Sequence, residues 1–362
     1  MDRGRLGNIA CHRPSHAADG ARLRGIGRRR GAWLALGLLV AAASPAAAAY
    51  YVDIGSASCS SAGPGTEAQP YCTISAAVSA HSGPGVEIVV KPGIYRETVN
   101  IPASGSGAGN FVIRSFAPGV VVTGADDFSG AAKWALSSGN VYLASTVNWS
   151  PFQVFVDATR LVPAAAGTTP AALAVNNFIY VSGQGLYVNL GGSNPGTHAT
   201  EVGHRLYAFR LSAKSYLTIQ GFHTTRCEDR AIYLSSGSNN CIVRGNQSDW
   251  NFRYGIAVST GSGELIEQNV VGDNQDHGIA LTSSSTGCTI QDNESYRNVL
   301  PTARASNGIY LNSSTSNLIR LPESGVVRTA PASPQRTTHG RRRLHRKPRI
   351  GTVGTSSRPD AP

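Results

Sequence analysis

This 362-residue sequence lacks an apolar run long enough to cross a membrane. A membrane-spanning helix needs about 20 apolar residues, and the run at 32–40 (AWLALGLLV) is much shorter. The cysteines form no CxxC pair, which argues against a metal site built from cysteine. We therefore predict neither a membrane-spanning helix nor a cysteine metal site.

The middle of the chain also has little basic charge. The whole sequence carries a formal net charge of +11, but residues 50–319 hold 14 basic and 17 acidic side chains. The excess arginine lies in residues 1–49 and 320–362, which carry net charges of +6 and +8. Because the central part is mildly acidic, we expect no nucleic-acid-binding surface on it.

The first 49 residues have the features of a secretory signal peptide. The arginines Arg28 to Arg30 precede the apolar run, and Ser44, Pro45 and four alanines follow it. A basic region, a short apolar region and small residues fit cleavage after Ala49. We expect a secreted protein, extracellular or periplasmic, with no membrane span after cleavage. The paired arginines leave the general and the twin-arginine export routes open.

The cysteines after the leader fall into two groups. Cys59 and Cys72 bracket a Gly- and Pro-rich loop in an exported chain, so we predict a disulfide that fixes the first turn of the fold. Cys227, Cys241 and Cys288 lie in a repeat region, where we expect them to be small buried hydrophobic residues.

A repeat dominates the sequence after residue 215. The strings AIYL, GIAV, GIAL and GIYL begin at Ala231, Gly255, Gly278 and Gly308, at steps of 24, 23 and 30 residues. A second series recurs out of phase with the first, at Thr218, Ile242, Leu265, Thr289 and Leu318, with steps of 24, 23, 24 and 29. The longer last steps indicate one insertion, at 299–304, in a single turn.

The two strings of each period predict two β-strands. They are short, rich in β-branched residues and bounded by Gly, Asn, Ser and Asp. Strands of successive periods can pair in parallel about 4.8 Å apart, so each period becomes one coil of a solenoid. Asn246, Asn269 and Asn293 occupy one equivalent position after a strand, and we predict that they stack as a hydrogen-bonded ladder.

The residues that follow the leader resemble the start of proteins related to pectate lyase L, in polysaccharide lyase family nine. The likeness is carried by YYVD at 50–53, GPGT at 63–66, QPYCTI at 69–74, GPG at 83–85, IVV at 88–90 and KPGIYRE at 91–97. The resemblance implies an all-β, right-handed parallel β-helix of the pectin-lyase type. It also implies a short helix at 75–80 that caps the first coil, which would otherwise expose its core and a strand edge.

Behind the leader, the pattern divides the chain into four further segments. Residues 50–127 form the cap and the first coils, and residues 128–211 form a β-rich insertion of antiparallel strands and hairpins. Residues 212–319 form the regular coils. Residues 320–362 are basic and rich in Pro and Thr and lose the repeat, so we interpret them as out-of-frame sequence or as a disordered tail.

The resemblance implies β-elimination on an acidic polysaccharide, with calcium held by several Asp and a Lys as the base. This sequence departs from that pattern. Asp276 is the one carboxylate kept in the string DHGIA, where the family has further Asp, and it is the candidate calcium ligand. Calcium prefers six to eight oxygens, so a calcium site is an alternative here rather than an expectation. The lysines between leader and tail, Lys91, Lys133 and Lys214, lie outside the repeats.

Alignment on the Gly-Ile strings places polar residues in two columns where a turn enters a strand. The first column holds Asp229, Arg253, Asp276 and Ser306, and the second holds Arg230, Tyr254, His277 and Asn307. One hypothesis makes His277 and Tyr254 an acid-base pair, with Arg230 and Arg253 binding substrate carboxylates. Asp229 and Asn307 would then complete the contacts with the substrate.

The alternative is that these side chains satisfy the backbone of the turns and form surface ion pairs. Asp249, Asp273 and Asp292 are expected to be simple turn residues. Two classes of function therefore remain. One is a monomeric secreted enzyme that cleaves an acidic polysaccharide along a groove on the stacked turns. The other is a non-catalytic carbohydrate-binding or cell-surface β-helix protein, or an inactive truncated relative of either.

Overall fold

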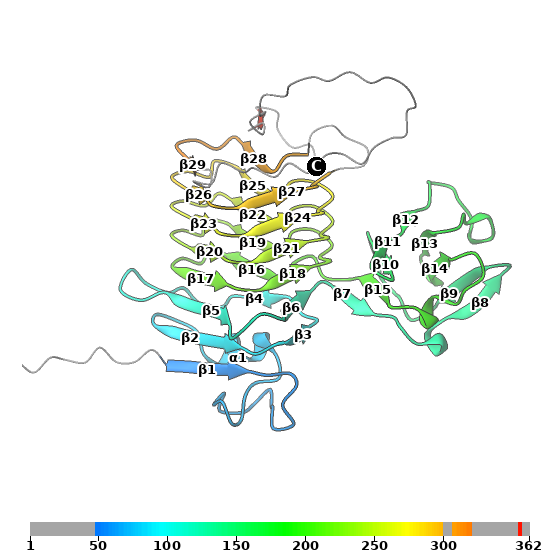
Figure 1. The fold of residues 1–362 in the computed structure, drawn as a ribbon, viewed down its shortest axis with the longest axis horizontal. Helices are drawn as coiled ribbons and strands as arrows, with labels where there is room; N and C mark the ends of the chain where they lie inside the picture. The colour runs from blue at the N-terminus through cyan, green and yellow to red at the C-terminus, as the bar shows by residue number, and fades with distance from the viewer. Residues whose placement is uncertain (1–47, 300–305, 321–353, 357–362) are drawn as a thin grey trace, which may run out of the picture. The chain divides into compact units, whose positions relative to one another are not determined.

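The computed structural model describes residues 48–299, 306–320 and 354–356. Short strands follow one another in a repeating order and build three parallel sheets (Figure 1). Within these ranges, no helix is both long and apolar enough to cross a membrane. The predicted signal peptide lies almost wholly outside the described residues, and so does most of the turn insertion at 299–304.

Three parallel sheets form the walls of a β-helix. The first sheet has the order β1 (Ala48–Val52), β2 (Val86–Val90), β5 (Phe111–Ser115), β17 (Leu217–Gln220), β20 (Ile242–Arg244), β23 (Leu265–Glu267), β26 (Thr289–Gln291) and β29 (Leu318–Arg320). The second sheet has the order β4 (Val99–Asn100), β16 (Phe209–Ser212), β19 (Ile232–Ser235), β22 (Ile256–Ser259), β25 (Ile279–Thr282), β28 (Ile309–Asn312) and β30 (Gly354–Ser356). The third sheet has the order β3 (Gly93–Tyr95), β6 (Val120–Thr123), β18 (His223–Thr225), β21 (Gln247–Asp249), β24 (Val270–Gly272) and β27 (Glu294–Tyr296).

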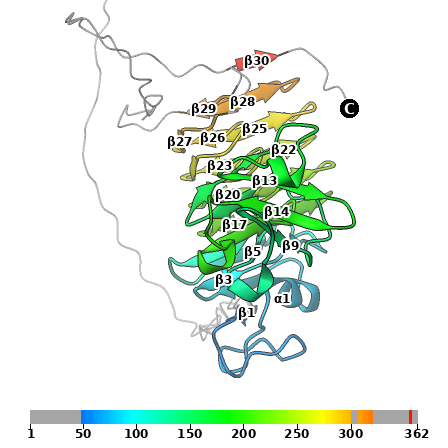
Figure 2. The ribbon, with the colours of Figure 1, turned by 90° about the vertical axis from the view of Figure 1, so that its right-hand side faces the viewer.

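The predicted register of the repeat strings is confirmed. In the second sheet, Ile232 pairs with Ile256, and Ile256 pairs with Ile279. In the first sheet, Thr218 pairs with Ile242, which pairs with Leu265. Figure 2 shows these strands of successive coils one above another. Segments 23 or 24 residues apart are therefore rungs of one spiral.

Each coil contains a third strand that the hydrophobic periodicity did not predict. Strand β21, for example, has the sequence Gln-Ser-Asp and no apolar string that would reveal it. Parallel pairing joins these strands, as it joins His223 to Gln247 and Gln247 to Val270. The polar composition of β18, β21 and β27 explains why the third strand was not predicted, although β24 has the apolar sequence Val-Val-Gly.

The first coil is closed by the predicted cap helix, α1 (Ile74–Ala80). Thr73 begins the helix, and its hydroxyl oxygen accepts a hydrogen bond from the backbone N–H of Ala76 over 3.1 Å. Ile74, Ala77 and Val78 are fully buried in the core shared by the coils.

The Cys59–Cys72 disulfide in the loop that precedes the helix is confirmed. The three cysteines of the repeats are buried and unpaired, as predicted.

The predicted asparagine ladder is also confirmed. The side-chain amide of Asn246 donates to Oδ1 of Asn269 over 3.0 Å, and the amide of Asn269 donates to Oδ1 of Asn293 over 2.9 Å. The same two oxygens accept the backbone N–H groups of Asn246 and Asn269. Each amide thus satisfies polar groups of two coils inside the core.

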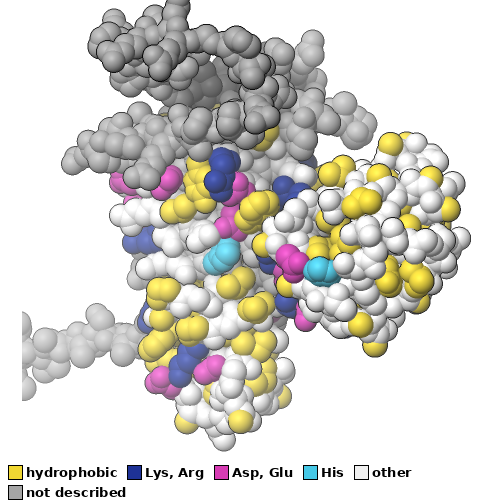
Figure 3. Space-filling model, turned by 45° about the vertical axis from the view of Figure 1, so that its right-hand side comes forward, with side chains coloured by type: hydrophobic (Ala, Val, Ile, Leu, Met, Phe, Trp, Pro, Cys, Tyr) yellow, Lys and Arg dark blue, Asp and Glu magenta, His cyan; other side chains and the backbone are white. Residues whose placement is uncertain are grey.

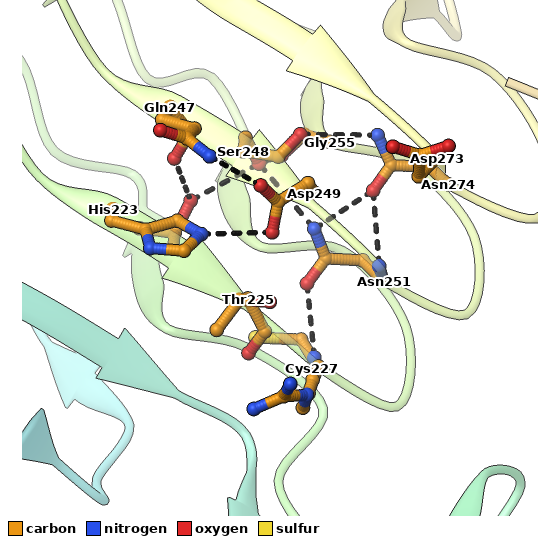
Figure 4. Close-up of polar contacts among 12 residues, drawn as sticks. His223, Thr225, Cys227, Gln247, Ser248, Asp249, Asn251, Gly255, Asp273 and Asn274 are labelled. Atoms are coloured by element: carbon orange, nitrogen blue, oxygen red, sulfur yellow. Dashed lines mark hydrogen bonds and ion pairs between the residues drawn. The ribbon is translucent and has the colours of Figure 1, made fainter. Parts of the chain in front are cut away.

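A second asparagine ladder, which the sequence analysis missed, follows the third sheet. Asn251 donates to Oδ1 of Asn274 over 2.8 Å, and Asn274 donates to Oδ1 of Asn298 over 2.9 Å. Figure 4 shows the Asn251 and Asn274 side chains in line between neighbouring coils. The three residues recur at steps of 23 and 24, so the same search for equivalent positions could have found them.

Replacement of Asn269 by Ala is expected to destabilise the protein by about 2–4 kcal/mol. Asn269 is 0% exposed, and its removal leaves the buried N–H of Asn246 without its side-chain acceptor and takes one hydrogen bond from the carbonyl of Val243. Urea unfolding measures the loss, with the exposed Asn140→Ala as the control. Equal stability of the two variants would contradict a stabilising ladder.

The insertion forms two small sheets between β6 and β16. One has the order β11 (Thr159–Arg160), β10 (Val154–Val156), β15 (Thr200–Gly203) and β7 (Ala125–Asp127). The other has the order β12 (Val162–Pro163), β13 (Asn177–Val181), β14 (Gly185–Asn189), β9 (Val141–Ala144) and β8 (Ala135–Ser138). Short 3-10 turns occur at Ala131–Lys133, Pro170–Ala172 and Pro195–Thr197. Most pairings are antiparallel, and the insertion has its own core, which includes Trp134, Phe178 and Leu186.

The insertion begins and ends slightly earlier than residues 128–211. Its strand β7 already starts at Ala125 and pairs with β15. Phe209 pairs with Val99 on one side and with Ile232 on the other, so β16 belongs to the coils. The physical reason is that Phe209 and Leu211 are fully buried core residues of the β-helix.

Most of the basic tail lies outside the described residues. The reading-frame hypothesis concerns this part of the chain and therefore also falls outside them. Arg320 ends β29, the last strand of the first sheet. Strand β30 pairs in parallel with β28 of the second sheet.

Candidate functional site

The turns that lead from the third sheet into the second sheet bring the first predicted column together. Arg253 lies between carboxylates of two neighbouring turns: its Nη1 is 3.8 Å from Oδ1 of Asp229, and its Nε is 3.9 Å from Oδ2 of Asp276. Asp229 also accepts a 2.5 Å hydrogen bond from Nη1 of Arg230. We call Asp229, Arg230, Arg253 and Asp276 the ionic cluster.

The members of the ionic cluster differ in exposure. The side chain of Arg253 is 41% exposed, whereas those of Asp229 and Asp276 are 15% and 17% exposed. The carboxylates therefore hold a guanidinium group that a molecule in solution can reach.

Burial changes the acidity of the cluster. It raises the pKa of Asp276 to about 6, although the charges of Arg253 and Arg230 oppose the change. Burial also raises the pKa of Asp229. Burial alone would lower the pKa of Arg253, but Tyr254 and the two carboxylates raise it above its usual value. Asp276 is thus ionised at neutral pH and becomes protonated in mildly acidic solution.

His277 is 5% exposed, and both of its ring nitrogens lie close to polar groups. Nδ1 accepts a hydrogen bond from the backbone N–H of Asn307 over 2.9 Å, and Nε2 lies 3.2 Å from Oδ1 of Asp276. Burial lowers the pKa of His277 to about 4, so the ring is neutral and its proton lies on Nε2, facing Asp276. This geometry favours an orienting role for His277 over the hypothesis that His277 and Tyr254 form an acid-base pair.

Two guanidinium groups lie close to the ring of Tyr254. The Cζ atoms of Arg230 and Arg253 are 5.2 Å and 4.8 Å from the centre of its ring, and Nη2 of Arg253 donates to its hydroxyl oxygen over 2.9 Å. The hydroxyl is therefore adjacent to the exposed guanidinium of Arg253. The structure brings together all the predicted site residues, with Asn307 contributing its backbone N–H to His277.

A column of stacked rings, not predicted from the sequence, runs along the second sheet. The ring of His277 stacks between Tyr254, at 5.4 Å between centroids, and Tyr310, at 4.0 Å. Ala257 and Ala280 are paired on the strands beside these rings and pack in the same cluster. Their small side chains leave room for the rings. The repeat strings have Tyr at this place in AIYL and GIYL but Ala in GIAV and GIAL, and this change could have indicated the stacked rings.

The insertion is attached to the turn that carries Asp229. The carboxylate of Glu228 accepts hydrogen bonds from the backbone N–H groups of Phe152 and Gln153, at 2.5 Å and 3.2 Å. Phe152 stacks on Phe252, with ring centroids 4.8 Å apart, two residues before Tyr254. The insertion therefore contacts the turns on which the candidate site is built.

Asp249 is not the simple turn residue that the sequence suggested. It ends β21, where its Oδ1 lies 2.8 Å from Nε2 of His223 and its Oδ2 accepts a 2.6 Å hydrogen bond from Gln247 (Figure 4). Burial alone would raise the pKa of Asp249, but these partners hold it below its usual value. Asp273 forms two hydrogen bonds with Arg297, at 2.6 Å and 2.5 Å. Each of these carboxylates therefore contacts a charged or titratable side chain of a neighbouring coil, His223 for Asp249 and Arg297 for Asp273.

The donor set fits calcium poorly. In the part of the chain that the structure describes, no three His, Cys, Asp or Glu side chains are grouped so as to hold a metal ion. Asp229 and Asp276 both face arginines, and two such carboxylates fall short of the six to eight oxygens that calcium takes. We therefore include no calcium ion in the reaction mechanism.

Known proteins with a similar sequence pattern or structure support the fold. A family model described as "Right handed beta helix region" matches residues 165–321. Among curated proteins, no sequence matches this chain. XylC, solved in complex with xylose, is 14% identical over 75% of this chain, with a TM-score of 0.53. This chain covers 60% of XylC.

Two further solved structures are similar. A protein described as a glycoside hydrolase is 10% identical over 76% of this chain and 77% of its own, with a TM-score of 0.58. Pectate lyase Pel9A is 14% identical over 75% of this chain and 61% of its own, with a TM-score of 0.43. The chain is thus an all-β protein with a right-handed parallel β-helix, similar in fold to XylC and to a protein described as a glycoside hydrolase.

Proposed function

We propose that this chain is an exported, monomeric β-helix protein that cleaves an acidic polysaccharide by β-elimination at the ionic cluster. The observation that carries the proposal is the exposed guanidinium of Arg253, which lies beside a titratable carboxylate, Asp276, and a tyrosine hydroxyl, Tyr254. Export is supported by the signal-peptide features of residues 1–49.

β-Elimination at a uronate needs three functions that these residues can supply. A cation must neutralise the carboxylate, a base must remove the proton on the adjacent carbon, and an acid must protonate the leaving oxygen. Arg253 binds the carboxylate, because a guanidinium matches the planar geometry of a carboxylate. Asp276 takes the proton, and the electron pair of the broken C–H bond forms the new C=C bond.

Tyr254 completes the reaction. As the bond to the leaving oxygen breaks, the Tyr254 hydroxyl transfers its proton to that oxygen, and Arg253 stabilises the phenolate that remains. Water then carries the proton held by Asp276 back to Tyr254. His277 positions Asp276 through its Nε2–H, and Arg230 holds Asp229 on the other side of Arg253.

Hydrolysis is a second candidate, because two carboxylates with raised pKa, Asp229 and Asp276, flank the exposed side chain of Arg253. Burial raises the pKa of both Asp229 and Asp276, as it does for the general acid of many glycoside hydrolases. A non-catalytic carbohydrate-binding protein on the same fold is the third.

One pair of assays separates these functions. The protein is incubated with polygalacturonate and with alginate, in calcium and in chelator, while ultraviolet absorbance of unsaturated uronates and new reducing ends are measured in parallel. Elimination raises both signals, whereas hydrolysis raises reducing ends alone. Binding of the polymer with neither signal would support the non-catalytic function and contradict our proposal.

The pH dependence of elimination follows from the role of Asp276. A base must be ionised, and Asp276 has a pKa of about 6, so kcat/KM should rise with pH through this value and level off above it. At pH 5 we expect about one tenth of the plateau rate. Rates at constant ionic strength check this, and a rate that falls as the pH rises through 6 would show that Asp276 acts as an acid.

A further inference from the structure

One column of residues directly after the third sheet has an unusual backbone conformation. Arg226, Trp250, Asp273 and Arg297 follow β18, β21, β24 and β27, and their φ angles lie between 46° and 57°. A left-handed conformation costs about 1–2 kcal/mol for a residue with a side chain, and Gly, Asn and Asp are the residues that usually adopt it. The same conformation occurs in other turns of the coils, for example at Gln268 and Thr260, but arginine and tryptophan are uncommon residues for it.

The β10–β11 hairpin of the insertion lies against this column. Phe155 pairs with Arg160 across the hairpin, and its ring meets Trp250 edge-on, with centroids 6.2 Å apart. The Cζ of Arg160 is 5.2 Å from the centre of the Phe155 ring and 5.4 Å from that of Trp250. The Cζ of Arg226 is 5.0 Å from the Phe155 ring. We call Phe155, Arg160, Arg226 and Trp250 the seam, and Figure 3 shows basic side chains where the insertion meets the coils.

The seam contains buried guanidinium donors that lack acceptors. Within the described ranges, Nε and Nη2 of Arg160 and Nε of Arg226 are buried and form no hydrogen bond. Asp273 is bound by Arg297, and Glu201 accepts from Nη1 of Arg226 rather than from its Nε. Arg160 is partly buried, and burial lowers its pKa to about 10 although the charge of Asp273 opposes the change. A cation whose lost hydration is not replaced by hydrogen bonds destabilises the fold. This cost is offset when an anion from outside the chain accepts these hydrogen bonds.

We propose that the seam is a second binding site, which takes an anionic group of a polysaccharide between Arg160 and Arg226 while Trp250 packs against the sugar. Planar guanidinium groups favour carboxylates and sulfate esters, which share this anionic chemistry. Trp250 and Arg253 belong to the same turn, so a chain bound in the seam can extend toward the ionic cluster. The inference rests on the proposed function only for the choice of a sugar as the carrier of the anion.

Calorimetric titration in the Arg253→Gln background tests the seam without the ionic cluster. The probes are tetragalacturonate, a sulfated tetrasaccharide and a neutral galactose tetrasaccharide. We expect one or both anionic probes to bind, and Arg160→Gln to weaken that binding at least tenfold. The anionic probe that binds more tightly shows whether the seam prefers the carboxylate of a uronate or a sulfate ester. The control is Arg114→Gln, which removes an arginine paired with Glu87 in the first sheet and should leave binding unchanged.

Thermal unfolding completes the test. If Arg160 serves a ligand, Arg160→Gln keeps or raises the midpoint of unfolding, because the substitution removes an uncompensated buried charge. Unchanged binding in Arg160→Gln, or equal binding of the neutral probe, overturns the inference. Seam binding without any cleavage of polymer would reject the proposed elimination and leave the inference standing, so the two failures are distinguishable.

Discussion

Replacement of Asp276 by Asn lowers kcat for elimination at least 100-fold at pH 7. An amide cannot accept the proton from the sugar, and general base catalysis typically contributes about 10²–10⁴-fold to a rate. Asn keeps the size of Asp and an oxygen that can face Nε2 of His277. The loss should therefore appear in kcat, with a much smaller change in KM, in initial rates measured from ultraviolet absorbance.

The matched control for this variant is Asp292→Asn. Asp292 is an exposed carboxylate with a φ of 54°, a conformation that Asn also tolerates, and it lies away from the ionic cluster. Equal kcat in the Asp276 variant and the control would remove Asp276 from the mechanism. A loss of rate accompanied by altered circular dichroism would instead mean that the turn had changed its fold, and Asp276→Glu would then serve as the second test.

Replacement of Glu264 by Gln stabilises the folded protein at pH 9 by about 3–5 kcal/mol. Glu264 is 1% exposed, Oε2 accepts a 2.6 Å hydrogen bond from the backbone N–H of Cys241, and Oε1 is buried and forms no hydrogen bond. Burial raises its pKa to about 8. Gln keeps the acceptor for Cys241 and carries no charge, as Asn317 does for Cys288 at the equivalent place two coils further on.

The sign of the effect depends on pH. Because the folded-state pKa of Glu264 is raised, its stabilising contribution is complete below about pH 4.5 and is lost as the pH rises through about 8. Wild type and Glu264→Gln should therefore have similar stability at pH 4.5 and differ at pH 9. Urea unfolding at both values measures this, with the exposed Glu294→Gln as the control. A variant that is no more stable than wild type at pH 9 would refute the effect.

The sequence predicted the fold because the signals it carries are local and periodic. Inward residues such as Ile232 and Ile256 must be apolar on every coil, so their spacing determined both the strands and the register. Register in turn determined the columns, which is why the repeat alone placed Asp229, Arg253 and Asp276 together. Strand β21 was not predicted, because its residues are held by strand pairing and show no apolar pattern.

The chemical environment of the site could not be predicted in the same way. The burial of His277 depends on the ring of Tyr310, which follows the insertion at 299–304 and so breaks the regular spacing of the repeat. The contact between Arg160 and Trp250 depends on how the insertion folds against the coils, and these residues are 90 positions apart. Long-range contacts of this kind leave no periodic pattern to detect.

The asparagine ladders also bear on how such a protein can change over generations. Each rung exchanges hydrogen bonds with the rungs directly above and below it, so an altered side chain on an outer turn disturbs few other residues. A protein built in this way can acquire a new specificity one coil at a time, while its interior scaffold stays the same.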